Sequence, residues 1–259
     1  MGNFNTIQAA KRRRWKSVDL MTNKNPTNAT HEGIKIVNAD NRCDFSTSSD
    51  LCICIVTWNM NGKHSVGGCG GIIGRKKGAV AMRINYKGIR MVFISCHLSA
   101  HARNVEERNS QCRHISHSVF SKHRSPYSRP DQVTIWLGDL NYRIQGIKTF
   151  PARNLIKKDL HKLLTGKDQL LQEAERGQIF NGYCEGTLTF KPTYKYNVGS
   201  SNYDTSYKVR VPSWTDRILF KIEDPKEINA TLHCYESLDD IYSSDHKPVR
   251  AHLCLKLSR

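Results

Sequence analysis

The stretch that most constrains the fold is an apolar run, Val133 to Leu137, which ends at Gly138 and is followed at once by polar residues. A short apolar run with β-branched residues that stops at a glycine predicts a buried strand. Such a strand delivers Asp139 and Asn141 to the edge of a sheet, which is where α/β enzymes present catalytic groups. Taken alone, an Asp/Asn turn that only caps a strand fits this segment equally well.

Further strands are expected before and after this one. Apolar segments with turn signals between them predict strands over residues 51–58, 79–86, 89–96, 208–211, 228–235 and 249–255, and one entered through Asp216 and Arg217. Helices are expected over 102–123 and, as a pair interrupted near Gly166, over 151–178. Many strands with few, unequal helices favour a mixed-sheet α/β fold over regular βαβ units.

Charge narrows the class of ligand. The chain has 40 Lys and Arg against 23 Asp and Glu, a net charge of +17, and much of the excess lies between Leu51 and Pro130. Such a field attracts polyanions, namely nucleic acid, an anionic membrane surface or a multiply phosphorylated small molecule. The nine cysteines show no C-x-x-C spacing, which predicts reduced thiols that mostly pack as small core residues.

The N-terminal region differs in character from the rest of the chain. Residues 1–48 are expected to form a flexible basic arm and linker, ahead of a folded domain over 49–259. The start Met1-Gly2-Asn3-Phe4-Asn5-Thr6 fits the N-myristoylation pattern, and a basic patch, Lys11–Lys16, supplies the second signal that a single acyl chain needs. We therefore expect a cytoplasmic protein attached to the cytosolic face of a membrane through Gly2 and this patch. A basic arm that is nuclear or binds nucleic acid is the alternative.

Seven polar residues lie beside the ends of predicted strands, which suggests that they meet in one pocket. They are Asn59, His97, Asp139, Asn141, Asp216, Asp245 and His246. Carboxylates with amide and imidazole neighbours suit a hard divalent cation, whereas the Cys/His spacing of structural zinc is absent. Metal-assisted attack of water on a phosphoryl centre needs a cation, a group that activates water and fixed donors around the phosphate. The sequence offers candidates for all three.

Three motifs in this order, G-D-L-N-Y-R, P-S-W-T-D-R-I-L and S-S-D-H-K-P-V, give the chain its family resemblance. It resembles the inositol polyphosphate 5-phosphatases, particularly the plant type, within the endonuclease/exonuclease/phosphatase superfamily, over roughly Leu51 to Leu257. The resemblance implies a four-layer α/β sandwich of two mixed β-sheets flanked by helices. It also implies Mg²⁺-dependent hydrolysis of the 5-phosphate of phosphoinositides, such as phosphatidylinositol 4,5-bisphosphate, or of soluble inositol polyphosphates.

The resemblance assigns roles to the matching positions. The catalytic positions of the family are matched by His97, Asp139, Asn141, Asp216 and His246, and its metal-site positions by Asn59 and Asp245. By this match Asp139 orients or deprotonates the attacking water, while His97 and Asn141 contact the phosphate. His246 stabilises the charge of the phosphate, with Asp216 as its orienting partner.

The same resemblance identifies residues that bind the substrate. Tyr194 and Lys195 in P-T-Y-K-Y resemble the residues that grip the 4-phosphate, and Arg210 stands where the family has another cation for it. Lys77 matches a lysine near the lipid-side phosphate. A headgroup with several phosphates needs several fixed cations, so these residues account for part of the positive charge.

One family feature has no counterpart here. The family has a helix, a strand and a Q-E motif with a metal-binding glutamate in a segment for which this chain has only residues 63–75, and no Asp or Glu occurs from Leu51 to Val105. We interpret the chain as internally truncated near 62–66. Magnesium binding should be weaker, because the hydration of the ion competes well, and the fold should be less stable.

Three functions are compatible with the sequence. The leading one is the 5-phosphatase, with impaired activity in this form. A catalytically weak phosphoinositide-binding protein would keep the cations and lack the metal. A nuclease of the DNase I kind is favoured by the net charge, but the inositol-type motifs make nucleic acid an unlikely partner. The sequence does not determine the preferred inositol phosphate, the acylation of Gly2 or the oligomeric state.

Overall fold

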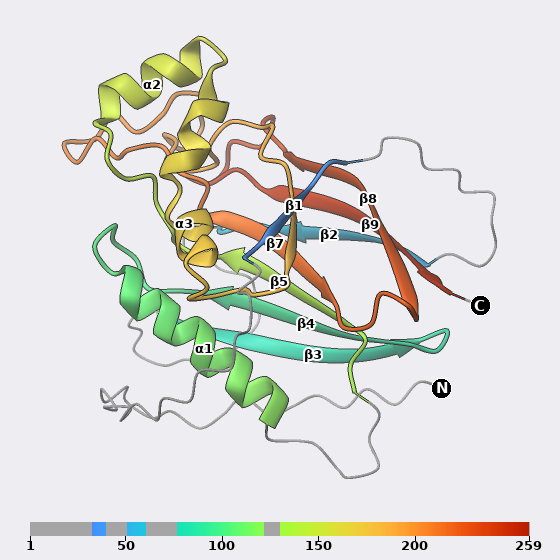
Figure 1. Ribbon diagram of the computed structural model, residues 1–259. Helices are drawn as coiled ribbons and strands as arrows, with labels where there is room; N and C mark the ends of the chain where they lie inside the picture. The colour runs from blue at the N-terminus through green and yellow to red at the C-terminus, as the bar shows by residue number, and fades with distance from the viewer. Residues whose placement is uncertain (1–32, 40–50, 61–76, 122–129, 259) are drawn as a thin grey trace, which may run out of the picture.

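In the computed structural model, which describes residues 33–39, 51–60, 77–121 and 130–258, two β-sheets lie face to face (Figure 1). The larger sheet has the order β1 (Lys35–Val37), β6 (Cys184–Gly186), β7 (Asp216–Ile222), β5 (Val133–Asp139), β4 (Ile89–His97) and β3 (Gly78–Tyr86). The smaller sheet has the order β2 (Leu51–Thr57), β9 (Val249–Leu257) and β8 (Ile228–Ser237). The larger sheet contains parallel and antiparallel pairs, as predicted, whereas both pairs of the smaller sheet are antiparallel.

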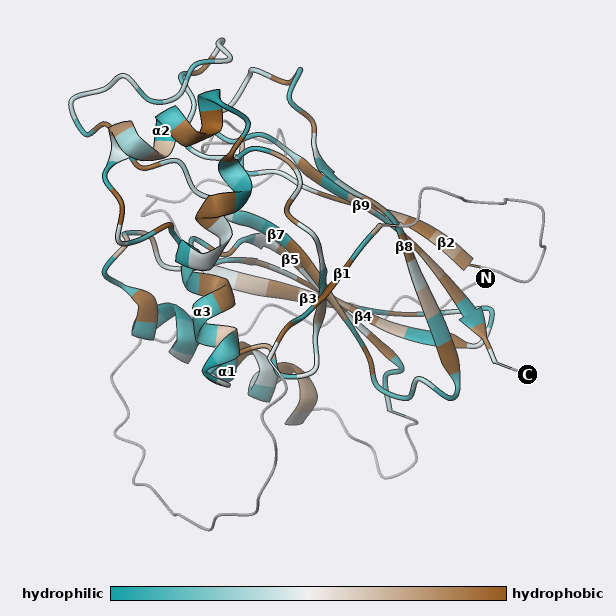
Figure 2. Cartoon of the chain, turned by 45° about the horizontal axis from the view of Figure 1, so that its top comes forward, coloured by the Kyte–Doolittle hydropathy of each residue, from teal (hydrophilic) through white to brown (hydrophobic). Residues whose placement is uncertain are grey.

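Four helices complete the described chain: α1 (Val105–Ser121), α2 (Thr149–Lys157), the 3₁₀ helix η1 (His161–Lys167) and α3 (Gln169–Glu175). Helices α1 and α3 pack on the outer face of the larger sheet, where Ile115 and Leu170 meet Ile94 and Trp136. Figure 2 shows that the helices of the described ranges lie toward the larger sheet and one end of the sandwich, and that none lies beside β2, β8 and β9. None of these helices is both long and apolar enough to cross a lipid bilayer.

The main core lies between the two sheets. Alternate residues of β9, such as Ala251 and Leu253, face Ile135 of β5 and Ile218 of β7 in one cluster. Strand β5 is covered on both faces, because Ile135 packs toward the smaller sheet while Trp136 packs toward the helices. A strand buried on both faces needs a continuous apolar run, which explains the pattern that predicted it.

Gly138 is required where β5 approaches β4. Its φ is +134°, and a Cβ at this position would lie 1.9 Å from the carbonyl oxygen of Cys96. The tight contact sits directly before the site residue Asp139, which pairs with His97 in the parallel ladder. The glycine that ends the apolar run therefore permits the two strands to place their terminal side chains together.

Arg217 of β7 ties its strand to α3 and to the neighbouring strand β6. Its guanidinium is fully buried and lies 2.9 Å from Asp168, the N-cap of α3, and 2.6 Å from Glu185 of β6. Its neighbour Asp216 points to the opposite face of β7, toward His246. Because side chains alternate along a strand, one Asp-Arg dipeptide serves both the site and the scaffold.

Three secondary-structure predictions are wrong. Residues 151–178 were expected to form two helices interrupted near Gly166, but three helices, α2, η1 and α3, cover this region and Gly166 lies inside η1. Lys35–Val37 lies within the predicted flexible linker but forms β1, parallel to β6, and Ile34 packs on the helix-side core. Three residues are too few for a periodic pattern to show. Residues 208–211 are not a strand, because the Asp204 carboxylate accepts hydrogen bonds from the backbone N–H groups of Ser206 and Arg210 and holds the segment as a turn and loop.

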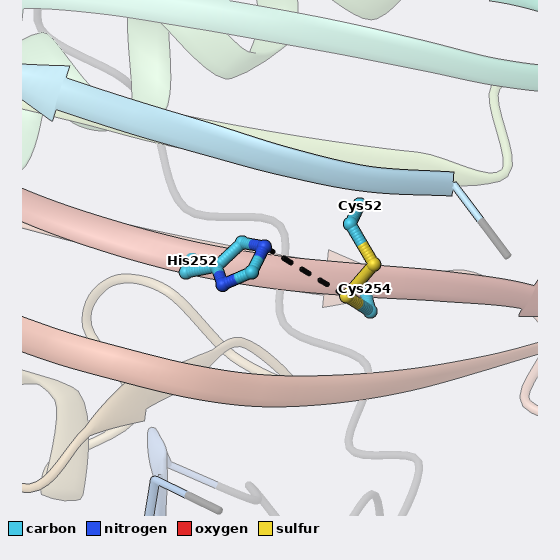
Figure 3. The surroundings of a disulfide bond; sticks show 3 residues. All are labelled: Cys52, His252 and Cys254. Carbon is cyan, nitrogen blue, oxygen red and sulfur yellow. Dashed lines mark hydrogen bonds between the residues drawn. A yellow bond between two sulfur atoms is a disulfide. The ribbon is translucent and has the colours of Figure 1, made fainter. Parts of the chain in front are cut away.

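The prediction of reduced cysteines is wrong for one pair. Cys52 of β2 and Cys254 of β9 are joined by a disulfide (Figure 3). They stand directly opposite each other in the antiparallel ladder, a juxtaposition that depends on strand register and is invisible in the linear sequence. Five other cysteines of the described chain are free, and Cys96 and Cys112 among them are buried as predicted.

Candidate active site

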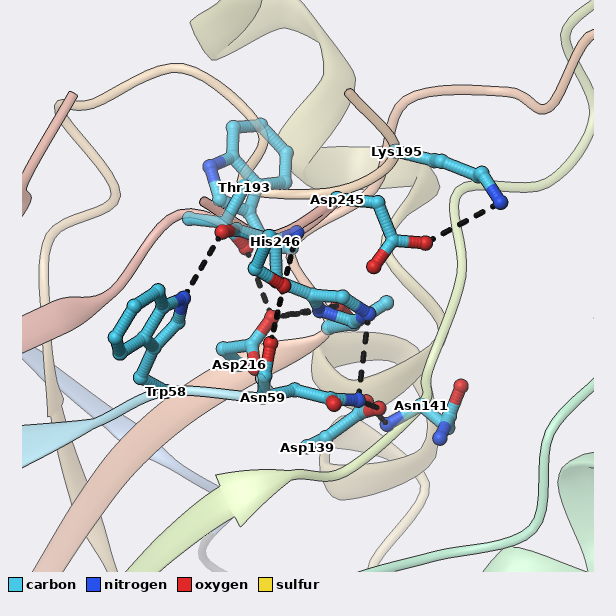
Figure 4. Close-up of polar contacts among 12 residues, drawn as sticks. Trp58, Asn59, Asp139, Asn141, Thr193, Lys195, Asp216, Asp245 and His246 are labelled. Carbon is cyan, nitrogen blue, oxygen red and sulfur yellow. Dashed lines mark hydrogen bonds and ion pairs between the residues drawn. The ribbon is translucent and has the colours of Figure 1, made fainter. Parts of the chain in front are cut away.

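The predicted site residues come together at one end of the sandwich. Strands β2, β4 and β5 end there, and β7 and β9 begin there, so Asn59, His97, Asp139, Asp216 and His246 all reach the same region. In the larger sheet, the ladder places His97 beside Asp139 and Asp139 beside Asp216. Figure 4 shows the side chains of Asn59, Asp139, Asp216 and His246 pointing toward one another from both sheets.

Asp139 is the centre of this cluster. One carboxylate oxygen accepts a hydrogen bond of 2.7 Å from the Asn59 amide and lies 3.1 Å from Nε2 of His97. The other accepts the backbone N–H of Asn141 at 3.1 Å. Burial alone would raise the pKa of Asp139, but the hydrogen bond from His97 and the charges of His246, His97 and Arg143 outweigh burial and lower the pKa to about 2. The carboxylate is therefore ionised at neutral pH.

His246 is held between Asp216 and Asn59. Its Nδ1 lies 2.7 Å from the Asp216 carboxylate, and its Nε2 lies 3.3 Å from the Asn59 amide nitrogen. Burial would lower the pKa of His246, but the charges of Asp216, Asp139 and Asp245 and the hydrogen bond to Asp216 raise it above 6.5. This environment favours the imidazolium form, which can stabilise negative charge.

The supporting contacts of this pair were missed by the sequence analysis. The hydroxyl of Thr215 donates a hydrogen bond of 2.8 Å to Asp216, and the indole N–H of Trp58 donates one of 3.1 Å to the carbonyl of His246. The Ser244 hydroxyl donates to the carbonyl of Asn59 at 2.5 Å and accepts the His246 N–H at 3.2 Å. These contacts lock the end of β2 to the start of β9. Their positions within T-W-N, W-T-D-R and S-S-D-H were the available signal.

The predicted substrate-binding residues differ in their placement. Lys195 lies 3.2 Å from the Asp245 carboxylate, and the Tyr194 ring packs on the His246 ring with 4.5 Å between centroids. The ammonium of Lys77 contacts Nε2 of His97. Arg210 follows the Asp204 loop, and its backbone N–H is bound to that carboxylate. No hydrogen bond joins its guanidinium to the other site residues within the described ranges.

Asn141 and Arg143 form the rim of the cluster. Asn141 has a φ of 58°, and its side-chain amide donates to the Leu98 carbonyl at 3.0 Å and accepts from Arg143. The Arg143 guanidinium also stacks over the Tyr194 ring at 4.3 Å. Arg143 belongs to the G-D-L-N-Y-R motif but was not among the residues chosen from the sequence. Its position makes it a further cation beside the carboxylates.

The donor set fits a divalent cation. Oxygen atoms of Asp216 and Asp245 are buried and have no hydrogen-bond partner in the described structure, and a buried carboxylate oxygen without a partner is costly. Ligand atoms of Asp139, Asp216 and His246 lie within 4.8 Å of one another. The first two acids that follow the missing segment do not replace the glutamate, since Glu106 pairs with Arg113 and Glu107 with Ser99.

Several known proteins are similar to this chain. Residues 14–252 match the model of endonuclease/exonuclease/phosphatase family 2. The type IV inositol polyphosphate 5-phosphatase 11 of Arabidopsis thaliana is 46% identical, with 99% of this chain and 98% of the relative covered. The type II inositol 1,4,5-trisphosphate 5-phosphatase of Mus musculus is 38% identical over 69% of this chain and 18% of its own length.

Two solved structures have a fold similar to that of this chain. The inositol polyphosphate 5-phosphatase domain of SPsynaptojanin, in complex with inositol (1,4)-bisphosphate and calcium, matches with a TM-score of 0.62 and 36% identity, over 71% of this chain and 53% of that chain. A Cimex nitrophorin matches with a TM-score of 0.56 but 24% identity, over 80% of this chain and 65% of that chain, and this likeness shows the fold alone. The expected sandwich of two sheets with flanking helices is confirmed, but within the described residues the smaller sheet is antiparallel instead of mixed, and the helices flank only the larger sheet.

The length of one alignment bears on the missing segment. The alignment with the Arabidopsis relative spans 331 positions, whereas this chain has 259 residues, a difference of 72. At least that many positions of the alignment have no counterpart here. The predicted truncation near 62–66 lies outside the described residues and stays a prediction that this difference supports.

Proposed function

This chain belongs to the inositol polyphosphate 5-phosphatase family, and we propose that it hydrolyses the 5-phosphate of phosphoinositides such as phosphatidylinositol 4,5-bisphosphate. The observation that carries the proposal is the meeting of Asn59, His97, Asp139, Asp216 and His246 at one end of the two sheets. These side chains combine an ionised carboxylate, a protonatable imidazole and amide donors within hydrogen-bonding distance. Phosphoryl transfer to water needs that combination.

Asp139 and His97 form the water-activating half of the site. The carboxylate of Asp139 is ionised and buried, and three donors fix its orientation, so it can accept a hydrogen bond from a water molecule. A carboxylate with so low a pKa is a weak base, and its main contribution is to orient that water. His97, which lies between Asp139 and Lys77, holds a phosphate oxygen.

His246 and the surrounding cations form the half that holds the phosphate. Asp216 keeps the Nδ1 proton of His246 in place, so that Nε2 faces the site and donates to the developing negative charge. Lys195 and Arg143 supply further positive charge beside Tyr194. A phosphate group that enters would exchange the Lys195–Asp245 ion pair and the hydrogen bond from Arg143 to Asn141 for contacts with its own oxygens.

The residues that would hold Mg²⁺ are Asn59 and Asp245. When bound, the ion would neutralise the charge that develops on the phosphate and its leaving group. The buried, unpaired oxygen of Asp245 supports this assignment, and the calcium ion in the SPsynaptojanin complex supports a divalent cation in the family. Because the family's metal-binding glutamate is missing, we infer weak binding of the ion and a low turnover.

The test is phosphate release from vesicles that contain phosphatidylinositol 4,5-bisphosphate, measured with added Mg²⁺ and with a chelator. Asp139→Ala should abolish phosphate release. Asp224→Ala removes an exposed carboxylate just before β8, at the end of the sandwich away from the site, and should leave release unchanged. A soluble inositol polyphosphate assayed beside the vesicles separates the two substrate classes. Vesicle sedimentation is measured on the same samples.

Each outcome has a defined meaning. Magnesium-dependent release that Asp139→Ala abolishes supports the phosphatase. Sedimentation with vesicles without release at any magnesium concentration would replace it with a phosphoinositide-binding protein. Cleavage of plasmid DNA by the wild type but not by Asp139→Ala would establish the nuclease instead.

We further infer that the protein acts at the cytosolic face of a membrane. The basis is the myristoylation pattern at Gly2 and the Lys11–Lys16 patch, which lie outside the described residues. Gly2→Ala should shift the protein from the membrane to the soluble fraction of cells that express it. An unchanged distribution would refute acylation as the anchor.

A further inference from the structure

The outer face of the smaller sheet carries an unusual group of side chains. Residues 249, 251, 253 and 255 of β9 fill the core between the sheets, so His252 and Cys254 face outward. Cys52 of β2 stands directly opposite Cys254, and Cys54 directly opposite His252. Directly opposite residues share a face, so the four side chains lie together on one side of the sheet.

Three of these residues are close enough to bind one ion. The two sulfurs of Cys52 and Cys254 and a ring nitrogen of His252 all lie within 4.8 Å of one another, and Nε2 of His252 is 3.9 Å from Sγ of Cys254 (Figure 3). Cys54 is a free, exposed thiol beside them. A set of two thiolates and an imidazole favours zinc over magnesium or calcium, which prefer oxygen ligands.

We propose that the reduced chain binds a zinc ion on the outer face of the smaller sheet, through the thiolates of Cys52 and Cys254 and the imidazole of His252. Cys54 or a water molecule supplies the fourth ligand of the tetrahedral zinc ion. The site is separate from the phosphatase site, because Cys52 and Asn59 are seven residues apart along the extended β2, a distance of about 23 Å. The proposal does not depend on the phosphatase activity.

The position of His252 in the sheet supports the role of a ligand. It lies two residues before Cys254 on β9 and directly opposite Cys54 of β2, so its ring shares the outer face with the sulfurs. The ring of His233 lies 5.5 Å from that of His252, so its position limits how the His252 ring can turn.

The disulfide and the zinc ion are alternative uses of the same two sulfurs. A thiol reductant such as glutathione breaks the S–S bond by exchange, giving two cysteine thiols and the disulfide of two reductant molecules. Zinc binding then displaces one proton from each thiol to the solvent and forms two Zn–S bonds. Both states join β2 to β9, but only the reduced one takes up metal.

The test is a Co²⁺ titration of the full chain after reduction and anaerobic removal of the reductant, followed by displacement with Zn²⁺. Thiolate ligands give a sulfur-to-cobalt charge-transfer band, and tetrahedral geometry gives intense d–d bands. We expect one Co²⁺ per chain at this site in the wild type and in Cys184→Ser, a matched control on β6 of the other sheet. Cys52→Ser and Cys254→Ser should lose the charge-transfer signal of that ion, and the oxidised wild type should show none.

His252→Gln separates a metal site from a mere pair of thiols. The variant should keep the fold, which circular dichroism checks. Its affinity for the metal should fall at least about tenfold, because losing even a group that only supports a metal ligand costs roughly that much. The proposal is overturned if the reduced wild type shows no charge-transfer band. It is equally overturned if Cys52→Ser and Cys254→Ser bind as the wild type does, because the metal would then lie elsewhere.

Discussion

Replacing Gly138 by alanine should disrupt the active site through the backbone alone. The new Cβ would lie 1.9 Å from the Cys96 carbonyl oxygen, where a contact of at least 3.0 Å is needed. Strands β4 and β5 would have to move apart by roughly 1 Å to relieve this contact. Those strands are the ones that carry His97 and Asp139 side by side.

Two terms give the expected magnitude. An alanine held at the positive φ of Gly138 costs roughly 1–2 kcal/mol, and overpacking between two buried strands costs roughly 1–3 kcal/mol. The sum, about 2–5 kcal/mol, is a large part of the roughly 5–15 kcal/mol by which a domain is stable. At about 2–4 °C per kcal/mol, the melting temperature should fall by about 4–20 °C.

Gly78→Ala is the matched control. Gly78 also lies in a strand of the larger sheet, but its φ is not in the left-handed region and no atom lies within 4 Å of an added Cβ. Its melting temperature should stay level or rise slightly, because alanine restricts the unfolded chain. Thermal unfolding followed by circular dichroism measures both variants. If Gly138→Ala melts within about 2 °C of the wild type, the close approach of β4 and β5 is not as described.

Three other predictions address charge and metal. Arg217→Met should lower the free energy of unfolding by about 3–5 kcal/mol, because Asp168 and Glu185 remain buried without their cation. Urea titration measures this change. The control Arg250→Met, which removes an exposed ion pair with Glu236, should change the free energy of unfolding little. The carboxylates that raise the pKa of His246 stabilise the fold through its imidazolium form. This stabilisation is fully present below pH 6.5 and is lost as the pH rises through the folded-state pKa. His246→Gln should therefore flatten the decline of the melting temperature above that pH, and parallel pH curves for the two proteins would contradict the assignment. Removing Mg²⁺ with a chelator should stop phosphate release without lowering the melting temperature by more than about 2 °C, since the site lies at the end of a sheet core that the ion does not build.

Local patterns predicted the long elements of the fold well. Strands were expected over 133–137, 79–86, 89–96 and 249–255, and each is found within two residues of those bounds. Burial on one or both faces of a strand produces a regular apolar pattern in the sequence. The three-residue strands β1 and β6 carry no such pattern, and their place is set by the register with neighbouring chain. The Cys52–Cys254 pair depends on register in the same way.

The candidate site was predictable in its residues but not in its connections. Motifs identified the acids, amides and histidines that meet at this end of the two sheets. The contacts of Trp58 and Ser244 with backbone carbonyls could not be predicted, because any backbone offers the same carbonyl group. The stacking of Arg143 on Tyr194 joins residues far apart in the chain, so it too required the fold.

The disulfide joins two points that are 202 residues apart, and β2, at the edge of its sheet, pairs with β9 alone among the described strands. In the chain-entropy view, a cross-link that closes so long a loop stabilises the fold by about 5 kcal/mol, because it removes conformations from the unfolded chain. Without it, β2 would be the element most prone to fray, and Asn59 would leave the site with it. The redox state of one cysteine pair thus sets how often the catalytic end of the molecule is fully assembled.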